Sequence, residues 1–319
     1  MERLRQEIGS HLETIRQQKL YRSLVEPEGI DFSSNDYLGL SKDPVLRQTI
    51  LQKLQENKLN YSLFSPASRL LRGDTNLHRT IEKRLAHFKG TEDALLFPSG
   101  YQANIGLLTT LIGPQDRVLS DSQNHASIID GLRLSRCKKI IFPHLSTNHI
   151  ENAIAKPYPG GETFLVTESL FSMDGDIAPL ADYAGLAKKY GAHLIVDDAH
   201  ATGIFGQKRG SGLLEYFQAH KHTLAIISTF GKAFGLFGGC VAGPRWLIEY
   251  LINRCRPFIF TTAVPQVLLF GIEAVLDYTQ AQPERRQRVL HLSDNLRSRL
   301  HAKHLNMGRS QGPIVPVVL

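Results

Sequence analysis

The stretch STFGKAFGLFGG, residues 228–239, places one lysine, Lys232, among glycines and small hydroxyl residues. The run TLAIIS just before it is apolar and β-branched, which is typical of a buried strand. A lysine at the end of a buried strand has two interpretations: a chance residue of a solvated loop, or a catalytic amine. The loop alone does not decide between them, so the decision depends on the residues at the other strand ends.

A second candidate stretch is HLIVDDAHATGIFG, in which Asp197 ends another apolar run. A buried carboxylate needs a cationic or hydrogen-bonding partner, and a protonated pyridine nitrogen is one such partner. Taken singly, paired aspartates after a strand also suit a helix cap, and a lone histidine also suits the surface. These alternatives weaken because Asp197, His200, His125 and Lys232 all follow predicted strands.

The third candidate is FPSGYQAN, where a strand is followed by Ser-Gly and a helical pattern. The free N–H groups of a helix start, here at Gly100 and Tyr101, form a ready phosphate site. The hydroxyl of Thr229, three residues before Lys232, is a further phosphate contact. The nucleotide-binding pattern GxxxxGK[ST] is absent, which removes the main support for a nucleotide kinase.

Together these residues suit pyridoxal 5′-phosphate (PLP). This cofactor needs a lysine for its Schiff base, a carboxylate at its pyridine nitrogen and a phosphate cup. A flat side chain against the ring also helps, and His125 is the candidate. The sequence therefore predicts a PLP site in which Lys232 carries the cofactor, and it predicts no metal.

The elements that position these residues alternate between strands and helices from about residue 90 to 245. Val/Ile/Leu-rich strands separated by helices indicate an α/β fold with a mostly parallel sheet covered on both faces. Ligands of such sheets bind beyond the carboxyl ends of the strands. The predicted strands are DALLF, RVLSD, KIIFP, TFLVTES, HLIVDDAH and TLAIIST.

The flanking segments predict a second, smaller layer. We expect residues 1–45 to be its N-terminal segment, 46–280 to be the large cofactor-binding domain, and 281–319 to be its C-terminal part. The start, MERLRQEIGSHLETIRQQKL, predicts an amphipathic helix. Near the end, Val289, Leu292, Leu296 and Leu300 recur at helical spacing and predict a helix with a basic outer face, followed by the strand-like run GPIVPVVL.

Composition narrows the class of protein. The chain of 319 residues is 42% hydrophobic and has no apolar run of membrane-spanning length, so we expect no membrane segment. Its three cysteines are scattered, which favours a reducing cytoplasm over disulfides or a zinc site. The net charge of +7 comes with no nucleic-acid recognition motif, so anionic small molecules are the expected partners.

Nearly the whole chain resembles the α-oxoamine synthases. The resemblance rests on FSSNDYLGLS, SRLLRGDTNLHRTIEKRLAHFKG, ALLFPSGYQAN, NHASIIDGLRLSR, VTESLFSMDGDIAPL, VDDAHATGIFG, STFGKAFG and RPFIFTTAVP. It implies the aminotransferase-like fold of PLP enzymes (fold type I). It also implies a residue-by-residue assignment of the site.

In that assignment Lys232 holds the cofactor, Asp197 pairs with its pyridine nitrogen and His125 stacks on its ring. His200 and Ser172 would hydrogen-bond the phenolic oxygen of the cofactor. The remaining implied contacts are Gly100, Tyr101 and Thr229 at the phosphate, Thr261 or Thr262 reaching it from the second subunit of a homodimer, and Asn35 and Glu168 near the substrates.

The resemblance is closest to the branch that serves biotin synthesis. It implies condensation of L-alanine with pimeloyl-CoA, or with a pimeloyl carrier protein, with loss of carbon dioxide. Two alternatives stay open: another reaction of the family, such as glycine with acetyl-CoA, and an inactive homologue.

Three departures from the family pattern stand out. FSPASRL replaces a glycine-rich segment, and Phe237 is bulky where most relatives carry serine. The run SQGPIVPVVL ends the sequence where relatives continue, so we expect a C-terminally truncated form that lacks the arginine for the substrate carboxylate.

Overall fold

The computed structural model describes residues 1–26, 28–56 and 62–318. The chain divides into two compact units, Met1–Ser34 and Asn35–Leu319. The first unit contains helix α1 (Glu2–Gln17), which confirms the predicted N-terminal helix and has no buried residue. The predicted division at residues 45 and 280 stays a prediction.

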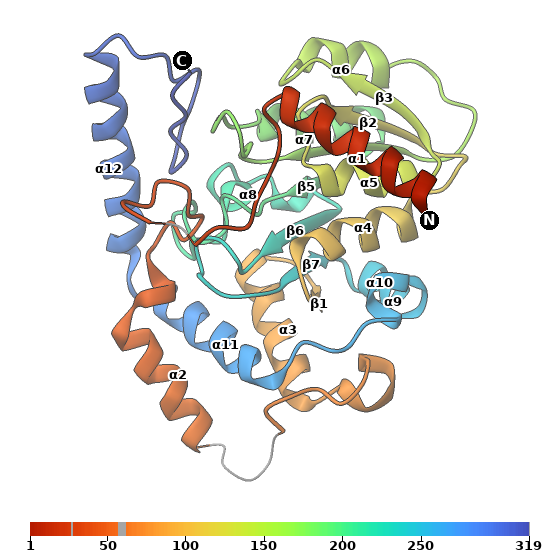
Figure 1. The fold of residues 1–319 in the computed structure, drawn as a ribbon. Helices are drawn as coiled ribbons and strands as arrows, with labels where there is room; N and C mark the ends of the chain where they lie inside the picture. Colours follow the sequence, from red (N-terminus) through yellow and green to blue (C-terminus); the bar gives the residue numbers. More distant parts are fainter. Residues whose placement is uncertain (27, 57–61, 319) are drawn as a thin grey trace. The chain divides into compact units, whose positions relative to one another are not determined.

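The second unit is built on one seven-stranded sheet (Figure 1). Its strand order is β1-β7-β6-β5-β4-β2-β3, and β7 is antiparallel to both of its neighbours, while the other pairs are parallel. The strands are β1 (Asp93–Phe97), β2 (Arg117–Asp121), β3 (Lys138–Phe142), β4 (Thr163–Glu168), β5 (His193–Asp197), β6 (Ala225–Thr229) and β7 (Gly239–Gly243).

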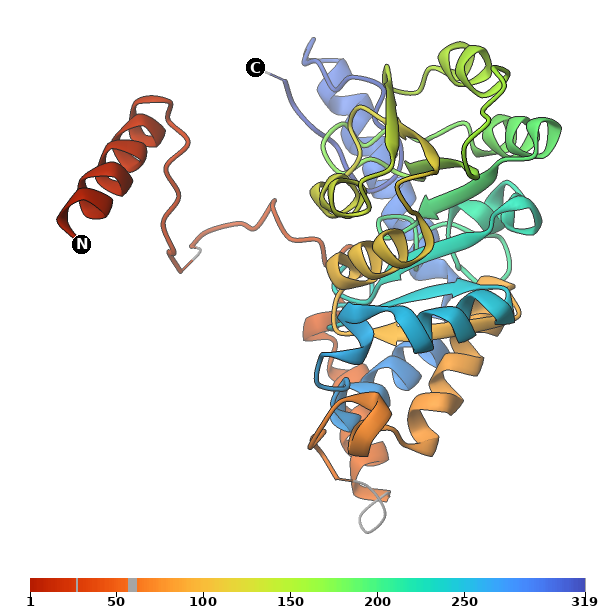
Figure 2. The same cartoon turned by 90° about the vertical axis from the view of Figure 1, so that its right-hand side faces the viewer.

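Helices cover both faces of the sheet (Figures 1 and 2). The helices of this unit are α2 (Pro44–Glu56), α3 (Asn76–Lys89), α4 (Gly100–Leu111), α5 (Ala126–Leu134), α6 (Thr147–Ile154), α7 (Leu180–Tyr190), α8 (Leu213–Tyr216), α9 (Arg245–Arg254), α10 (Arg256–Ile259), α11 (Gln266–Ala281) and α12 (Pro283–His301). Single turns lie at η1 (Leu40–Lys42), η2 (Arg69–Gly73) and η3 (His220–His222).

The alternation of side chains along each strand produces two hydrophobic cores. In β5, Leu194 and Val196 belong to one core and Ile195 belongs to the other. Successive strand residues point to opposite faces, so a strand buried on both faces must be apolar throughout. This requirement explains the confirmation of the central predicted strands; the edge strand β3 is also confirmed, although most of its residues are exposed.

Two details of the predicted C-terminal region are wrong. Residues 313–317 form no strand, because Pro313 and Pro316 lack the N–H that a ladder needs; there is only an isolated bridge between Asn306 and Val318. Helix α12 forms as predicted, but its apolar face is buried only in part: Val289 packs against the core, whereas Leu292 and Leu296 are 53% and 44% exposed.

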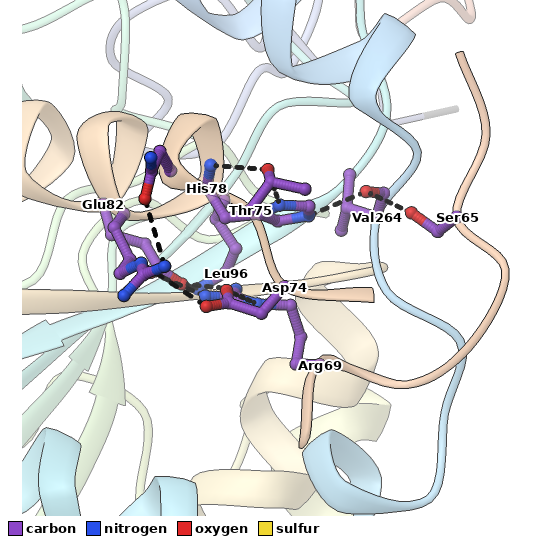
Figure 3. Close-up of polar contacts among 10 residues, drawn as sticks. Ser65, Arg69, Asp74, Thr75, His78, Glu82, Leu96 and Val264 are labelled. Atoms are coloured by element: carbon purple, nitrogen blue, oxygen red, sulfur yellow. Dashed lines mark hydrogen bonds and ion pairs between the residues drawn. The ribbon is translucent and has the colours of Figure 1, made fainter. Parts of the chain in front are cut away.

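A buried ion pair anchors α3 to the sheet and to the preceding loop (Figure 3). The Arg69 guanidinium donates to both carboxylate oxygens of Glu82, at 2.7 and 2.9 Å, and to Asp74 at 2.7 Å. Glu82 also accepts from the backbone N–H of Leu96 in β1 at 3.0 Å. Burial raises the pKa of Glu82, and Arg69 opposes that shift.

The first turn of α3 extends this network to the loop before α11. Thr75 caps α3, and its hydroxyl lies 2.8 Å from Nδ1 of His78. Nε2 of His78 lies 2.9 Å from the carbonyl oxygen of Val264, which also accepts from the Ser65 hydroxyl at 3.1 Å. Burial, with the charge of Arg69, lowers the pKa of His78 to about 4. A neutral ring therefore donates to Val264 and accepts from Thr75.

We expect Arg69→Met to lower the free energy of unfolding by about 3–5 kcal/mol, because it leaves the Glu82 carboxylate buried without a cation. Urea denaturation measures the change. Arg79→Met is the matched control, since the Arg79 side chain is 61% exposed and also pairs with Asp74. Equal losses in the two variants would contradict the assigned importance of the buried pair.

Candidate active site

The predicted site residues follow three adjacent parallel strands. β4 ends at Glu168, β5 at Asp197 and β6 at Thr229, and Lys232 lies three residues beyond β6. Because these strands are parallel neighbours, their carboxyl ends lie at one edge of the sheet. The structure therefore brings the lysine and the two carboxylates together.

The amine of Lys232 is the free group of this edge. It makes no hydrogen bond or ion pair with any residue that the structure describes. Burial lowers the pKa of Lys232, and the Asp197 carboxylate, with Glu168 when it is ionised, opposes that shift. A lowered pKa increases the share of neutral, nucleophilic amine at neutral pH.

The Asp197 carboxylate has only neutral donors in hydrogen-bond contact among the described residues. Its Oδ2 accepts from the Asn104 side chain at 2.6 Å, and its Oδ1 accepts from the N–H of Ala199 at 3.0 Å. Asp197 is 7% exposed, and the buried Oδ1 of Asn104 has no partner in the described chain. A buried carboxylate whose direct partners are neutral donors suits a protonated nitrogen of a ligand.

The same asparagine extends to His125. Asn104 donates to the Ser127 hydroxyl at 3.0 Å, and Ser127 Oγ lies 2.8 Å from Nδ1 of His125. His125 is the residue before α5, and its Nδ1 accepts from the N–H of Ser127. This chain of hydrogen bonds orients the His125 ring relative to Asp197.

Glu168 holds the loop of His125 in place. Its Oε1 accepts from the His125 N–H at 2.6 Å, and its own N–H donates to the Asn124 side chain at 3.1 Å. Burial, followed by the charge of Asp197, raises the pKa of Glu168 to about 8 against the opposing effect of Lys232. Glu168 therefore carries a proton at neutral pH in the chain without ligand.

His200 completes the edge beyond β5. It is 6% exposed, and burial, with the charges of Lys232 and His125, lowers its pKa to about 2. The ring is therefore neutral. Its Nδ1 lies 2.7 Å from the hydroxyl of Tyr37.

The predicted phosphate cup is closely packed. Ser99 caps α4 by accepting from the Gln102 N–H at 3.1 Å, and a Cβ at Gly100 would lie 3.3 Å from Cβ of Thr229. Thr229 accepts from the Gly231 N–H at 3.3 Å. The start of a 12-residue helix and the lysine loop thus meet at one point.

For Tyr101, Ser172, Thr261 and Thr262, the described contacts make no link to this group, whereas Asn35 is linked to it only through Tyr37. The Tyr101 hydroxyl donates to Asp130 at 2.6 Å. Ser172 lies in the tight turn between β4 and α7, and Thr261 and Thr262 follow α10. Asn35 Oδ1 lies 3.3 Å from the Tyr37 hydroxyl. The roles assigned to these residues stay predictions.

Three residues of this site were missed in the sequence: Tyr37, Asn104 and Ser127. Asn104 lies one helical turn after Gly100, and a polar residue at that spacing is a signal that could have identified it. Tyr37 lies in the motif FSSNDYLGLS, but no local pattern connects it to His200, 163 residues away.

Two other features lie outside this edge. His144, Asp174 and Asp176 have metal-ligand side chains close together, but both ring nitrogens of His144 already contact carboxylates, of Asp121 and Asp176. A cavity of about 630 Å³ lies at the opposite ends of β5 and β6, where His193 and Thr223 are among its lining residues.

Comparisons with known proteins agree on one family. The sequence profile of "Aminotransferase class I and II" matches residues 27–319. The 8-amino-7-oxononanoate synthase of Geobacter sulfurreducens is 39% identical over 327 residues, covering 98% of this chain and 82% of that protein. Among the described residues, no helix has the length and apolar character needed to span a membrane.

Solved structures give the same result. The 8-amino-7-oxononanoate synthase of Francisella tularensis superposes with a TM-score of 0.76 at 30% identity, covering 91% of this chain and 81% of that one. A serine palmitoyltransferase variant from S. paucimobilis, with a bound PLP–myriocin aldimine, has a TM-score of 0.87 at 26% identity, with coverages of 98% and 84%.

The chain therefore belongs to the class I and II aminotransferase family of PLP enzymes, and within it to the α-oxoamine synthases. It is a PLP-dependent transferase of the acyltransferase type. The geometry described above fits the cofactor: a free, buried amine for its aldehyde, and a buried carboxylate with only neutral hydrogen-bond donors for its ring nitrogen.

We expect Lys232→Ala to abolish covalent attachment of PLP. Borohydride reduction of the PLP-loaded chain, followed by peptide mapping, should label the peptide of Lys232 in the unmodified protein and no peptide in the variant. Lys189→Ala, at an exposed lysine, should be labelled like the unmodified protein. Labelling of a different lysine would contradict the assignment.

A second expectation concerns pH. Between about pH 4.5 and 8 the folded, cofactor-free chain holds a proton on Glu168 that the unfolded chain has released. This raised pKa makes stability fall as pH rises through that range, by up to about 1.4 kcal/mol per pH unit. Glu168→Gln should remove that part of the decline, because its amide oxygen still accepts from His125 but does not ionise.

Urea denaturation of the cofactor-free chain at several pH values measures this slope. Glu151→Gln is the control, because Glu151 is a surface residue paired with Lys189, and its pKa is lowered. A slope for Glu168→Gln equal to that of the unmodified chain would show that Glu168 is ionised throughout.

Proposed function

We propose that this protein condenses L-alanine with a pimeloyl thioester, of CoA or of a carrier protein, to form 8-amino-7-oxononanoate for biotin synthesis. The observation that carries the proposal is the convergence of a free Lys232 amine, Asp197 and Glu168 at one edge of the sheet. The chain is also 39% identical to the 8-amino-7-oxononanoate synthase of Geobacter sulfurreducens. In the net reaction the α carbon of the amino acid gives up its proton, loses its carboxyl group as carbon dioxide, and takes up a proton again in place of the lost carboxyl group. A C–C bond forms to the acyl carbonyl, and the thiol leaves.

PLP, when bound, supplies an electron sink for the electron pair that the α proton leaves behind. In our proposal Lys232 attaches the cofactor, and its Nζ, with a lowered pKa, accepts and returns the α proton. Asp197 holds a proton on the ring nitrogen, and the His125 ring lies against the cofactor. His200 and Ser172 meet its phenolic oxygen.

The proposed contacts to the rest of the ligands follow the sequence assignment. The N–H groups at Gly100 and Tyr101, with the Thr229 hydroxyl, hold the phosphate. Asn35 and Glu168 contact the substrates. A protonated Glu168 suits this position because it donates a hydrogen bond to a carboxylate or carbonyl oxygen without adding a like charge.

A second copy of the chain is part of this proposal. Thr261 or Thr262 would reach the phosphate of the neighbouring subunit. The side chains around that segment support a homodimer, since Leu71 and Phe260 are 77% and 72% exposed. Large apolar side chains at such exposure are typical of an interface.

The test is product analysis with a matrix of substrates. L-alanine, glycine and L-serine are each incubated with pimeloyl-CoA, acetyl-CoA and palmitoyl-CoA, and products are identified by mass spectrometry. We expect L-alanine with pimeloyl-CoA to give 8-amino-7-oxononanoate, and Lys232→Ala to give none. A larger yield from glycine with acetyl-CoA, or from serine with palmitoyl-CoA, would identify a different α-oxoamine synthase. No product from any pair would identify an inactive homologue.

A further inference from the structure

Tyr37 lies on a loop that is stabilised by hydrogen bonds to a side chain of the same loop. The Asp36 carboxylate accepts from the N–H of Leu40 at 2.9 Å and from the N–H of Ser41 at 3.0 Å. Gly39 turns the chain with φ of +65°, a conformation that favours glycine. The backbone that carries Tyr37 is therefore fixed by local hydrogen bonds.

This loop packs directly on the loop of Lys232. Gly235 has φ of +61°, and a Cβ there would lie 2.6 Å from the backbone nitrogen of Ser41. No side chain fits between the two segments. The close contact places Tyr37 beside the strand ends, although it is far from them in the sequence.

The hydroxyl of Tyr37 has one hydrogen and two neighbouring groups. Nδ1 of His200 lies 2.7 Å away, and Oδ1 of Asn35 lies 3.3 Å away. An O–H···O hydrogen bond normally spans about 2.5–3.0 Å, so the contact to Asn35 is too long for a good bond. The hydroxyl hydrogen therefore points to Nδ1 of His200.

A neutral imidazole carries one hydrogen, and an accepting Nδ1 leaves that hydrogen on Nε2. His200 is neutral because it is buried beside Lys232 and His125. Nδ1 is occupied by Tyr37, so Nε2 is the ring nitrogen that remains to meet a ligand.

We propose that Tyr37 is a positioning residue that fixes the tautomer of His200, so that Nε2–H presents a hydrogen-bond donor to the bound cofactor. The part that concerns the cofactor rests on the role given to His200 under the proposed function. A ring held by Tyr37 donates to an anionic oxygen without rotating or exchanging its proton between nitrogens, which is preorganisation in the sense that favours binding.

The direct test is the position of the His200 proton. The full chain is labelled with ¹⁵N-histidine, and long-range ¹H–¹⁵N spectra with and without PLP show which ring nitrogen is protonated. The His200 signal is identified by its loss in His200→Asn. We expect protonated Nε2 in the unmodified chain, and a substantial Nδ1–H form in Tyr37→Phe.

PLP affinity is measured on the same samples. Tyr37→Phe should bind PLP about three- to tenfold more weakly, the range of one net hydrogen bond. Tyr278→Phe is the matched control, because it also removes a hydroxyl hydrogen bond, the one from Tyr278 to Asp43 at 3.0 Å, but away from the strand ends. This variant should keep both the His200 tautomer and the PLP affinity of the unmodified chain.

The possible outcomes separate the role of Tyr37 in orienting His200 from the assignment of His200 to the cofactor. Protonated Nδ1 in the unmodified chain, or an unchanged tautomer in Tyr37→Phe, overturns the role of Tyr37. A changed tautomer with unchanged PLP affinity supports the role of Tyr37 in orienting His200, and contradicts the assignment of His200 to the cofactor. Failure of the unmodified chain to bind PLP contradicts the cofactor site itself.

Discussion

The buried carboxylate of Asp197 is the constraint on which the site depends. A charged group at 7% exposure needs partners, and its direct partners in the described chain are two neutral N–H donors. The nearby Lys232 and Glu168 respond to this charge: it opposes the loss of the Lys232 proton and favours retention of the Glu168 proton. Burial is the larger cause of both pKa shifts, and the Asp197 carboxylate opposes the shift of the Lys232 amine and reinforces the shift of Glu168.

The parallel sheet makes this arrangement possible. β4, β5 and β6 deliver Glu168, Asp197 and the lysine loop to one edge, and the two hydrophobic cores on either face fix the strands. Hydrogen bonds from α4 and from the start of α5 then orient the side chains, through Asn104 and Ser127. The rigid sheet fixes the distances between the strand ends, while the connecting segments supply and orient the reactive side chains.

Much of this follows from sequence pattern, for physical reasons that differ between elements. The central strands were predictable because strands buried on both faces are mostly apolar runs, and the edge strand β3 was predictable from its β-branched run KIIF. The lysine and acidic residues were predictable from their places at strand ends. β7 was missed because GCVAG is short and starts with glycine. Tyr37 was missed because its contact with His200 depends on how two distant loops pack at Gly235, which no local pattern encodes.

The central claim is that Asp197 holds a proton on the ring nitrogen of PLP. The most direct measurement is the ¹⁵N NMR shift of ¹⁵N-labelled PLP bound to the unmodified chain and to Asp197→Asn. Our account predicts a protonated pyridine nitrogen in the unmodified complex and an unprotonated one in the variant, because an amide does not stabilise the positive charge as a carboxylate does. An unprotonated nitrogen in the unmodified complex, or the same protonation state in both, would contradict it.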